Sequence, residues 1–326
     1  MELRNPNRPI ARPRANRDHH GAPDPIHNTP ATLRRWQTGH MTFQRLGVVG
    51  GGLMGSGIAE VGARAGLDTI VVEADAPSSD RAQKRTEASL ARAVRSGKLD
   101  EAAQERALSF LTFTSDFDAL ADRDLVVEAV IEAESAKLDI FRRLDAVVTG
   151  DDAVLASNTS SIPIMKLAMA TQRPSQVIGI HFFNPVPVLR LVEVVTSLLT
   201  SDDTISRATA FAKDTLSKRV IRSQDRAGFI VNALLIPYIL SAIRMMESGF
   251  ATADDIDAGM VEGCAHPLGP LHLADLIGLD TTMAVADSLY AEFKEPLYAA
   301  PPLLARMVEA GLLGRKTGRG FYLYKG

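Results

Sequence analysis

Short apolar runs alternate with longer amphipathic segments from about residue 45 to residue 222. The runs predict strands, and the segments between them, with charged residues at helical spacing, predict helices. Strands are expected at residues 45–49, 69–73, 108–113, 124–130, 153–157, 177–181, 190–196 and 219–222. Helices are expected at residues 56–65, 78–107, from about 132 to 148, and 202–217. This alternation predicts an α/β fold with a doubly wound, mostly parallel sheet.

The pattern changes after Asp225. Residues 227–243 form a 17-residue stretch without charge, which is at the short limit for a membrane span. Because it contains Asn232, Pro237 and Ser241, we interpret it as a buried helix instead. Further helical signals near residues 252–262, 270–290 and 300–312 predict an all-α C-terminal domain.

We therefore expect one domain at residues 42–224 and a second, helical domain at residues 225–326. The apolar surplus of the helical domain favours a homodimer. Residues 1–41 differ from both, because the first forty hold seven Arg, six Pro, four His and no Ser. We interpret them as a disordered extension, with a mitochondrial transit peptide as a weaker alternative.

The composition excludes several classes of protein. A net charge of -3 favours neither nucleic acid nor an anionic membrane as partner. The single cysteine, Cys264, fits a reducing compartment such as the cytoplasm, and no Cys/His cluster has zinc-ligand spacing in the expected domains.

Gly50-Gly-Gly-Leu-Met-Gly55 lies between a predicted strand and a predicted helix. Its glycines match G-x-G-x-x-G in the context that makes the motif informative. Gly50 would permit the tight turn, Gly52 a close approach of a pyrophosphate, and Gly55 close packing of helix on strand. The helix N-terminus would favour the phosphates. The alternative is a glycine-rich turn in an unrelated α/β protein.

Glu73 ends the next predicted strand, 23 residues after Gly50. A carboxylate near this offset binds the ribose hydroxyls in Rossmann-type domains and would repel a 2′-phosphate. Ala74 and Asp75 supply no positive charge beside it, so we predict NAD rather than NADP.

Charged and hydroxyl groups follow two other strands. Glu132 and Lys137 fall at the start of a predicted helix, where a solvated helix face is the simplest interpretation. Ser160 and Ser161 precede Pro163. We expect Ser161 to cap the helix that follows, which leaves Ser160 for a ligand at the carboxyl end of a parallel strand.

His181 and Glu193 stand on two apolar runs joined by Asn184-Pro-Val-Pro187. Two strands joined by this turn would bring the imidazole opposite the carboxylate. A His oriented by a carboxylate transfers protons near neutral pH. The alternative is a core histidine with Glu193 on a solvated face.

Residues 314–322 are basic and rich in turn residues. We interpret them as a solvated tail; binding of a ligand's phosphates is the minority interpretation.

Seven motifs in order resemble the 3-hydroxyacyl-CoA dehydrogenase family, most of all its stand-alone bacterial 3-hydroxybutyryl-CoA dehydrogenases. The resemblance runs from about Phe43 to Tyr324. The motifs are Gly50-Gly-Gly-Leu-Met-Gly55, Asp124-Leu-Val-Val-Glu-Ala129, Ser157-Asn-Thr-Ser-Ser161, His181-Phe-Phe-Asn-Pro-Val-Pro187, Gly228-Phe-Ile-Val-Asn232, Gly278-Leu-Asp-Thr-Thr282 and Gly314-Arg-Lys-Thr-Gly-Arg-Gly-Phe-Tyr322. One departure is Ala227, where the family commonly has Pro. The absence of this proline is expected to loosen the linker between the domains.

The resemblance implies oxidation of a 3-hydroxyacyl-CoA by NAD, or reduction of acetoacetyl-CoA, in a homodimer. It makes His181 the base and Glu193 its partner, with Ser160 and Asn232 at the reacting oxygen. The implied cofactor-binding residues are Gly50, Gly52, Leu53, Met54, Gly55, Glu73, Glu132, Lys137, Ser160 and Asn184. The alternatives are a dehydrogenase of a free hydroxy acid and a non-catalytic NAD-binding protein.

Overall fold

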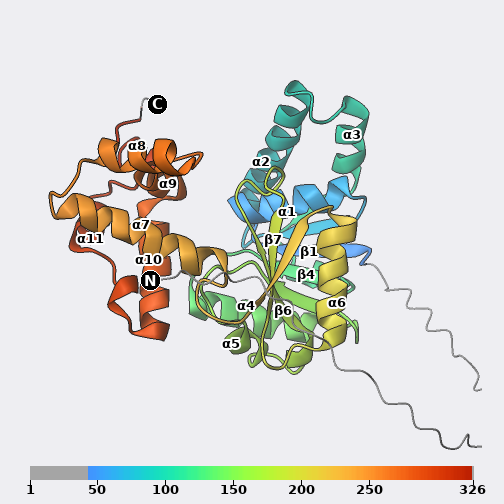
Figure 1. Cartoon of the computed structure of the whole chain (residues 1–326). Helices are drawn as coiled ribbons and strands as arrows, with labels where there is room; N and C mark the ends of the chain where they lie inside the picture. The colour runs from blue at the N-terminus through green and yellow to red at the C-terminus, as the bar shows by residue number, and fades with distance from the viewer. Residues whose placement is uncertain (1–42, 325–326) are drawn as a thin grey trace, which may run out of the picture. The chain divides into compact units, whose positions relative to one another are not determined.

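The computed structural model describes residues 43–324, so the predicted extension at residues 1–41 lies outside the described residues. One sheet dominates the first part of this range, and helices alone make up the second (Figure 1). The strands are β1 (Arg45–Val49), β2 (Asp68–Val72), β3 (Leu111–Thr114), β4 (Leu125–Glu128), β5 (Val154–Ser157), β6 (Val177–Phe182), β7 (Leu191–Thr196) and β8 (Arg219–Gln224). The predicted fold class is confirmed.

Helices lie between the strands and then follow one another. They are α1 (Leu53–Arg64), α2 (Ala76–Arg95), α3 (Glu101–Ser109), α4 (Glu134–Val147), α5 (Ile164–Ala168), α6 (Asp202–Ala210), α7 (Val231–Glu247), α8 (Ala253–Cys264), α9 (Pro270–Ile277), α10 (Leu279–Phe293) and α11 (Pro302–Glu309). The helix predicted over residues 78–107 is two helices, α2 and α3, because Gly97 adopts a positive φ of 68° and ends the first.

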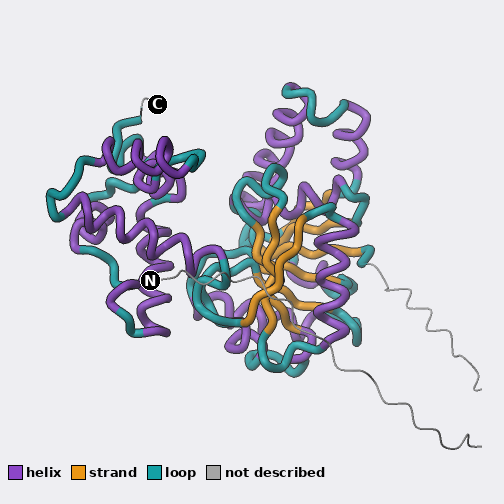
Figure 2. The backbone as a smooth tube through the Cα atoms, viewed as in Figure 1, coloured by secondary structure: helices purple, strands orange, loops and turns teal. Residues whose placement is uncertain are grey.

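The eight strands form one sheet in the order β3-β2-β1-β4-β5-β6-β7-β8. The strands of this sheet are orange in Figure 2. All neighbours are parallel except β6 and β7, which pair antiparallel and are connected by residues 183–190. The carboxyl ends of β1, β2, β4 and β5 therefore meet at one edge, and the amino end of β7 joins them there. In such sheets ligands bind at this edge.

Side chains alternate between the two faces of the sheet. Leu125 and Val127 face a core that includes residues of α1 and α6, whereas Val126 faces a core with α4 and α5. Phe141 of α4 is fully buried there and contributes about 1.5–3 kcal/mol by its removal from water. Helices thus cover both faces of the sheet, which explains why its central strands are apolar at successive positions.

The C-terminal segment is not the solvated tail that its basic composition suggested. The Asp275 carboxylate, 1% exposed, accepts hydrogen bonds from the backbone N–H groups of Phe321 and Tyr322 and from the Tyr324 hydroxyl. Burial, together with the hydrogen bond to Asp275, raises the pKa of Tyr324 to about 12. A Cβ on Gly320 would stand 1.9 Å from Asp275 Oδ1, so the backbone passes too close for any side chain.

The uncharged stretch near residue 230 forms α7 and packs in the core of the helical part. Among the helices of residues 43–324, none is long and apolar enough to cross a membrane, which confirms the interpretation of this stretch.

Candidate active site

The glycine-rich turn connects β1 to α1. Gly50 has a φ of 91°, and a Cβ there would meet the Ala129 carbonyl oxygen at 2.9 Å. A Cβ on Gly55 would lie 1.7 Å from the Gly50 carbonyl oxygen, whereas one on Gly52 would meet nothing within 4 Å. The fold thus requires glycine at positions 50 and 55, whereas the space beside Gly52 is open. No described side chain caps α1, so its first N–H groups are available to an anion.

Glu73 follows β2, and its Oε1 accepts a hydrogen bond from Gly51 N at 2.7 Å. The carboxylate is therefore held against the glycine-rich turn. The sequence showed no positive charge beside Glu73, but Arg85 of α2 donates from Nη1 to the Gly51 carbonyl oxygen at 2.5 Å. Inspection of the residues next to Glu73 missed this cation, because Arg85 lies in the third turn of α2.

His181 and Glu193 are paired in register across β6 and β7, as predicted. His181 Nδ1 lies 2.8 Å from Glu193 Oε2, and the two residues are 6% and 0% exposed. The alternative of a solvated Glu193 is wrong. Glu193 Oε1 also accepts from Ile230 N and Val231 N, at 3.1 and 3.0 Å, where α7 begins. One buried carboxylate thus orients the imidazole and binds the N-terminus of a helix.

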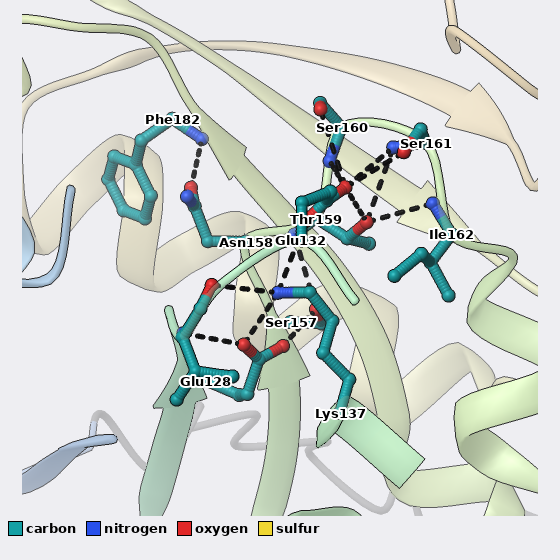
Figure 3. A network of polar contacts seen from close by, with 11 residues as sticks. Glu128, Glu132, Lys137, Ser157, Asn158, Thr159, Ser160, Ser161, Ile162 and Phe182 are labelled. Atoms are coloured by element: carbon teal, nitrogen blue, oxygen red, sulfur yellow. Dashed lines mark hydrogen bonds and ion pairs between the residues drawn. The ribbon is translucent and has the colours of Figure 1, made fainter. Parts of the chain in front are cut away.

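Glu132 and Lys137 belong to a network of polar contacts at the carboxyl ends of β4 and β5 (Figure 3). The Lys137 ammonium, 1% exposed, lies 2.6 Å from Glu128 Oε1 and 3.2 Å from Glu132 Oε2. Glu128 is fully buried and accepts further hydrogen bonds from Ser157 Oγ and Val130 N. The interpretation as a solvated helix face is wrong, because Lys137 is an internal cation shared by two carboxylates.

Glu132 holds the loop that contains Ser160 (Figure 3). Its Oε1 accepts from Thr159 Oγ1 at 2.5 Å, Ser160 N at 2.9 Å, and Ser161 N and Oγ at 3.1 and 3.0 Å. Burial alone would raise the pKa of Glu132, but the Lys137 charge and these hydrogen bonds outweigh burial and hold the pKa below its ordinary value. Glu132 is thus an ionised anchor for this loop at neutral pH.

The prediction that Ser161 caps the following helix is wrong. Its hydroxyl donates to Glu132, and no side chain of the loop caps α5. The first amides of α5, on Ile164 and Met165, donate instead to the two oxygens of Asp225, at 2.8 and 2.7 Å. Asp225 follows β8, about sixty residues later, so only the folded sheet brings the cap to its helix.

A cavity of about 640 Å³ lies beside these groups. The predicted site residues in its wall are Met54, Glu132, Lys137, Ser160, His181, Asn184 and Asn232. Those outside the wall are Gly50, Gly52, Leu53, Gly55, Glu73 and Glu193. Apolar side chains of the helical part complete the wall, namely Val231, Leu235, Ile236, Leu273, Leu276, Ile277 and Val285. A ligand here would meet polar groups on one side and an apolar surface on the other.

Asn184 lies in the pocket loop, residues 184–189, which begins with a cis Asn184–Pro185 peptide bond. Lys218 holds this loop, because its Nζ donates to the carbonyl oxygens of Val186 and Leu189, at 2.5 and 2.8 Å. No pattern in the sequence indicated the contacts of this lysine. Asn232, at the start of α7, makes no side-chain hydrogen bond within residues 43–324, so its amide is available to a ligand.

The looser linker expected at Ala227 stays a prediction, but the residue makes a contact that a proline could not. Its N–H donates to Glu292 Oε2 of α10 at 2.9 Å, and a proline has no N–H to donate. The linker is therefore fixed to the helical part by a bond that the proline could not make.

Comparison with known proteins agrees with this geometry. Residues 45–226 match the NAD binding domain of the 3-hydroxyacyl-CoA dehydrogenases, and residues 228–324 match the C-terminal domain. The chain is 58% identical over 282 residues to a 3-hydroxybutyryl-CoA dehydrogenase of Mycobacterium tuberculosis, a match that covers 86% of this chain and 99% of the relative. It is 39% identical over 285 residues to the mitochondrial hydroxyacyl-coenzyme A dehydrogenase of Sus scrofa, covering 85% and 90%.

Two solved structures are similar over nearly the whole described range. The crystal structure of M. tuberculosis FadB2 has a TM-score of 0.86 and 58% identity, covering 87% of this chain and all of that chain (100%). The (S)-3-hydroxybutyryl-CoA dehydrogenase of Ralstonia eutropha has a TM-score of 0.83 and 43% identity, covering 87% and 100%.

Proposed function

Because the chain belongs to the 3-hydroxyacyl-CoA dehydrogenase family, we propose that it oxidises a 3-hydroxyacyl-CoA to the 3-oxoacyl-CoA with NAD, reversibly. A short-chain substrate, 3-hydroxybutyryl-CoA, is favoured by the names of the relatives. The observation that supports this chemistry most directly is the buried pair of His181 and Glu193 at 2.8 Å beside the cavity.

The residues present fit a dinucleotide. Gly52 leaves open space, the first N–H groups of α1 have no side-chain cap, and Glu73 is fixed beside them. These groups would hold the pyrophosphate and a ribose. When bound, NAD accepts the hydride from the carbon that bears the hydroxyl. Lys137 contacts Glu128, Glu132 and the Val130 carbonyl oxygen, so we assign it to hold Glu132 more than to bind the cofactor.

His181 is proposed to take the proton of the substrate hydroxyl. Its Nδ1–H donates to the Glu193 carboxylate, which leaves the lone pair on Nε2 for the substrate. Glu193 stabilises the imidazolium that forms, and in the reverse direction the same Nε2–H is returned to the oxygen.

Ser160 and Asn232 are proposed to hold the reacting oxygen. Both line the cavity with His181, and the Glu132 carboxylate fixes the backbone of Ser160. Two hydrogen-bonding groups beside the base would orient the oxygen and the carbon that bears it, which lowers the entropic cost of reaction. We assign Asn184, which lies on the pocket loop, to the cofactor side of the cavity.

The test is consumption of NADH with acetoacetyl-CoA, run beside NADPH and beside free acetoacetate. We expect turnover with NADH and the thioester only. Turnover of free acetoacetate in preference to the thioester would indicate a dehydrogenase of free hydroxy acids. NADH binding without turnover of either would indicate a non-catalytic NAD-binding protein.

We propose further that residues 42–224 form the cofactor-binding domain and residues 225–326 a domain for substrate binding and homodimer formation. Exposed apolar side chains on the helical part support the dimer, among them Phe250 at 79% and Leu297 at 47% exposure. Light scattering of the purified protein tests it, and a monomeric mass would refute it. The single cysteine favours the cytoplasm as its compartment.

A further inference from the structure

Gly51 is held from both sides by side chains of opposite charge. Its N–H donates to Glu73 Oε1 at 2.7 Å, and its carbonyl oxygen accepts from Arg85 Nη1 at 2.5 Å and from Ser56 Oγ at 2.7 Å. Because both charged groups bond atoms of one residue, the carboxylate and the guanidinium lie within about 9 Å of each other. The expected ribose site is therefore bordered by an anion and a cation, not by an anion alone.

Arg85 is an exposed residue, and only one of its guanidinium N–H groups makes a hydrogen bond within residues 43–324, the one to Gly51. A guanidinium has five N–H donors, so others remain for a ligand. No carboxylate among residues 43–324 lies within ion-pair distance of it, in contrast to Arg45 or Arg123 on the same domain. Its positive charge is thus not neutralised by a direct partner.

We propose that Arg85 is a second determinant of cofactor choice. Its guanidinium can bind a 2′-phosphate, but the negative charge of Glu73 prevents this phosphate from binding in the wild type. This inference rests on the proposed function of the dinucleotide site. Glu73 binds the ribose hydroxyls and repels a phosphate on the same ribose. Arginine binds phosphate by several parallel hydrogen bonds, and its long side chain turns readily toward an anion. Removal of the Glu73 charge would therefore leave a site with a cation already in place.

Two variants distinguish the effect of the Glu73 charge from the effect of the space that its side chain occupies. Glu73→Gln keeps an acceptor for Gly51 N and removes only the charge, whereas Glu73→Ser also makes room. Isothermal titration of each variant with NADH and with NADPH, without any acyl thioester, gives the two dissociation constants. We expect NADPH to bind at least about tenfold more tightly to one or both variants than to the wild type, the range of one charge-assisted hydrogen bond. NADH should bind more weakly, because the ribose hydroxyls lose their charged partner.

The role of Arg85 is tested in the variant that gains NADPH affinity. Adding Arg85→Ala should abolish the gain, whereas adding Lys84→Ala should keep it, because Lys84 has the same charge on the same helix without the bond to Gly51. Raising NaCl from 0.05 to 0.5 M should reduce the gain as the charges are screened.

Thermal midpoints show which variants are folded, and only folded variants are compared. The proposal is overturned if neither gains more than about twofold in NADPH affinity, or if the gain survives Arg85→Ala. Since no substrate is present, such a failure leaves the proposed reaction intact. Failure of the reaction itself would appear as wild-type protein that does not turn over acetoacetyl-CoA.

Discussion

Glu193→Gln should lower either the turnover or the free energy of unfolding, because the glutamine side chain cannot replace all the hydrogen bonds of the carboxylate. The carboxylate accepts three hydrogen bonds, one at Oε2 from His181 and two at Oε1 from Ile230 N and Val231 N. A glutamine has one acceptor oxygen and one NH₂ group, so one side must face a donor.

If the NH₂ faces His181, Nδ1 must accept, and the proton moves to Nε2, where the base is needed. Turnover should then fall by about 10²–10⁴, the usual contribution of a positioned base. If the NH₂ faces the two N–H groups of α7, two bonds to a charged acceptor are lost. At about 1.5–3 kcal/mol each, the free energy of unfolding should then fall by about 3 kcal/mol or more.

The assay is kcat for acetoacetyl-CoA reduction by NADH, measured with the urea unfolding midpoint of the same preparation. Glu60→Gln is the matched control, because Glu60 is also buried, at 1% exposure, but lies on α1 and pairs with Arg64. We expect the control to retain wild-type turnover. Turnover within threefold of wild type in Glu193→Gln, together with an unchanged unfolding midpoint, would refute the reasoning.

Three further predictions concern other parts of the site. His181→Ala should lower kcat by about 10²–10⁴ while the dissociation constant of NADH, measured by fluorescence, stays unchanged; full activity would exclude His181 as the base. Because the pKa of Glu132 is lowered in the folded protein, its ionised form stabilises the fold above the unfolded-state pKa, and that contribution is lost as pH falls through the lowered value. Urea melts between pH 7 and pH 3 should therefore show a shallower acid loss for Glu132→Gln, and identical slopes would contradict the assignment. Lys218→Met leaves two carbonyl oxygens of the pocket loop without their donor, so KM for acetoacetyl-CoA should rise about tenfold with NADH affinity kept, and Lys218→Arg should restore part of the loss.

The features that could be predicted from the sequence are those set by local pattern. Apolar runs gave the strands, and the turn residues between two runs placed His181 opposite Glu193, because a hairpin register is determined by the chain within it. The glycine-rich turn could be predicted because it lies between a strand and a helix. Glu73 could be predicted beside it because this residue ends the next strand.

Contacts between distant elements could not be predicted in this way. Asp225 caps a helix about sixty residues earlier, and Arg85 extends from α2 to the glycine-rich turn. The contacts of Lys137 depend on which strands are neighbours in the sheet, since Glu128 and Ser157 meet only because β4 pairs with β5. Periodicity shows which face of an element is polar, but it does not show which partner that face meets.

The linker residue Ala227 also has a consequence for measurement. A proline has no amide proton, whereas Ala227 has one, and this proton is donated to Glu292 Oε2. Its exchange with deuterium requires the linker to separate from α10, so the exchange rate reports the free energy of that local opening. At the junction between the two matched family domains, the chain thus contains a native probe of domain motion, whose exchange should slow when dinucleotide and thioester bind together.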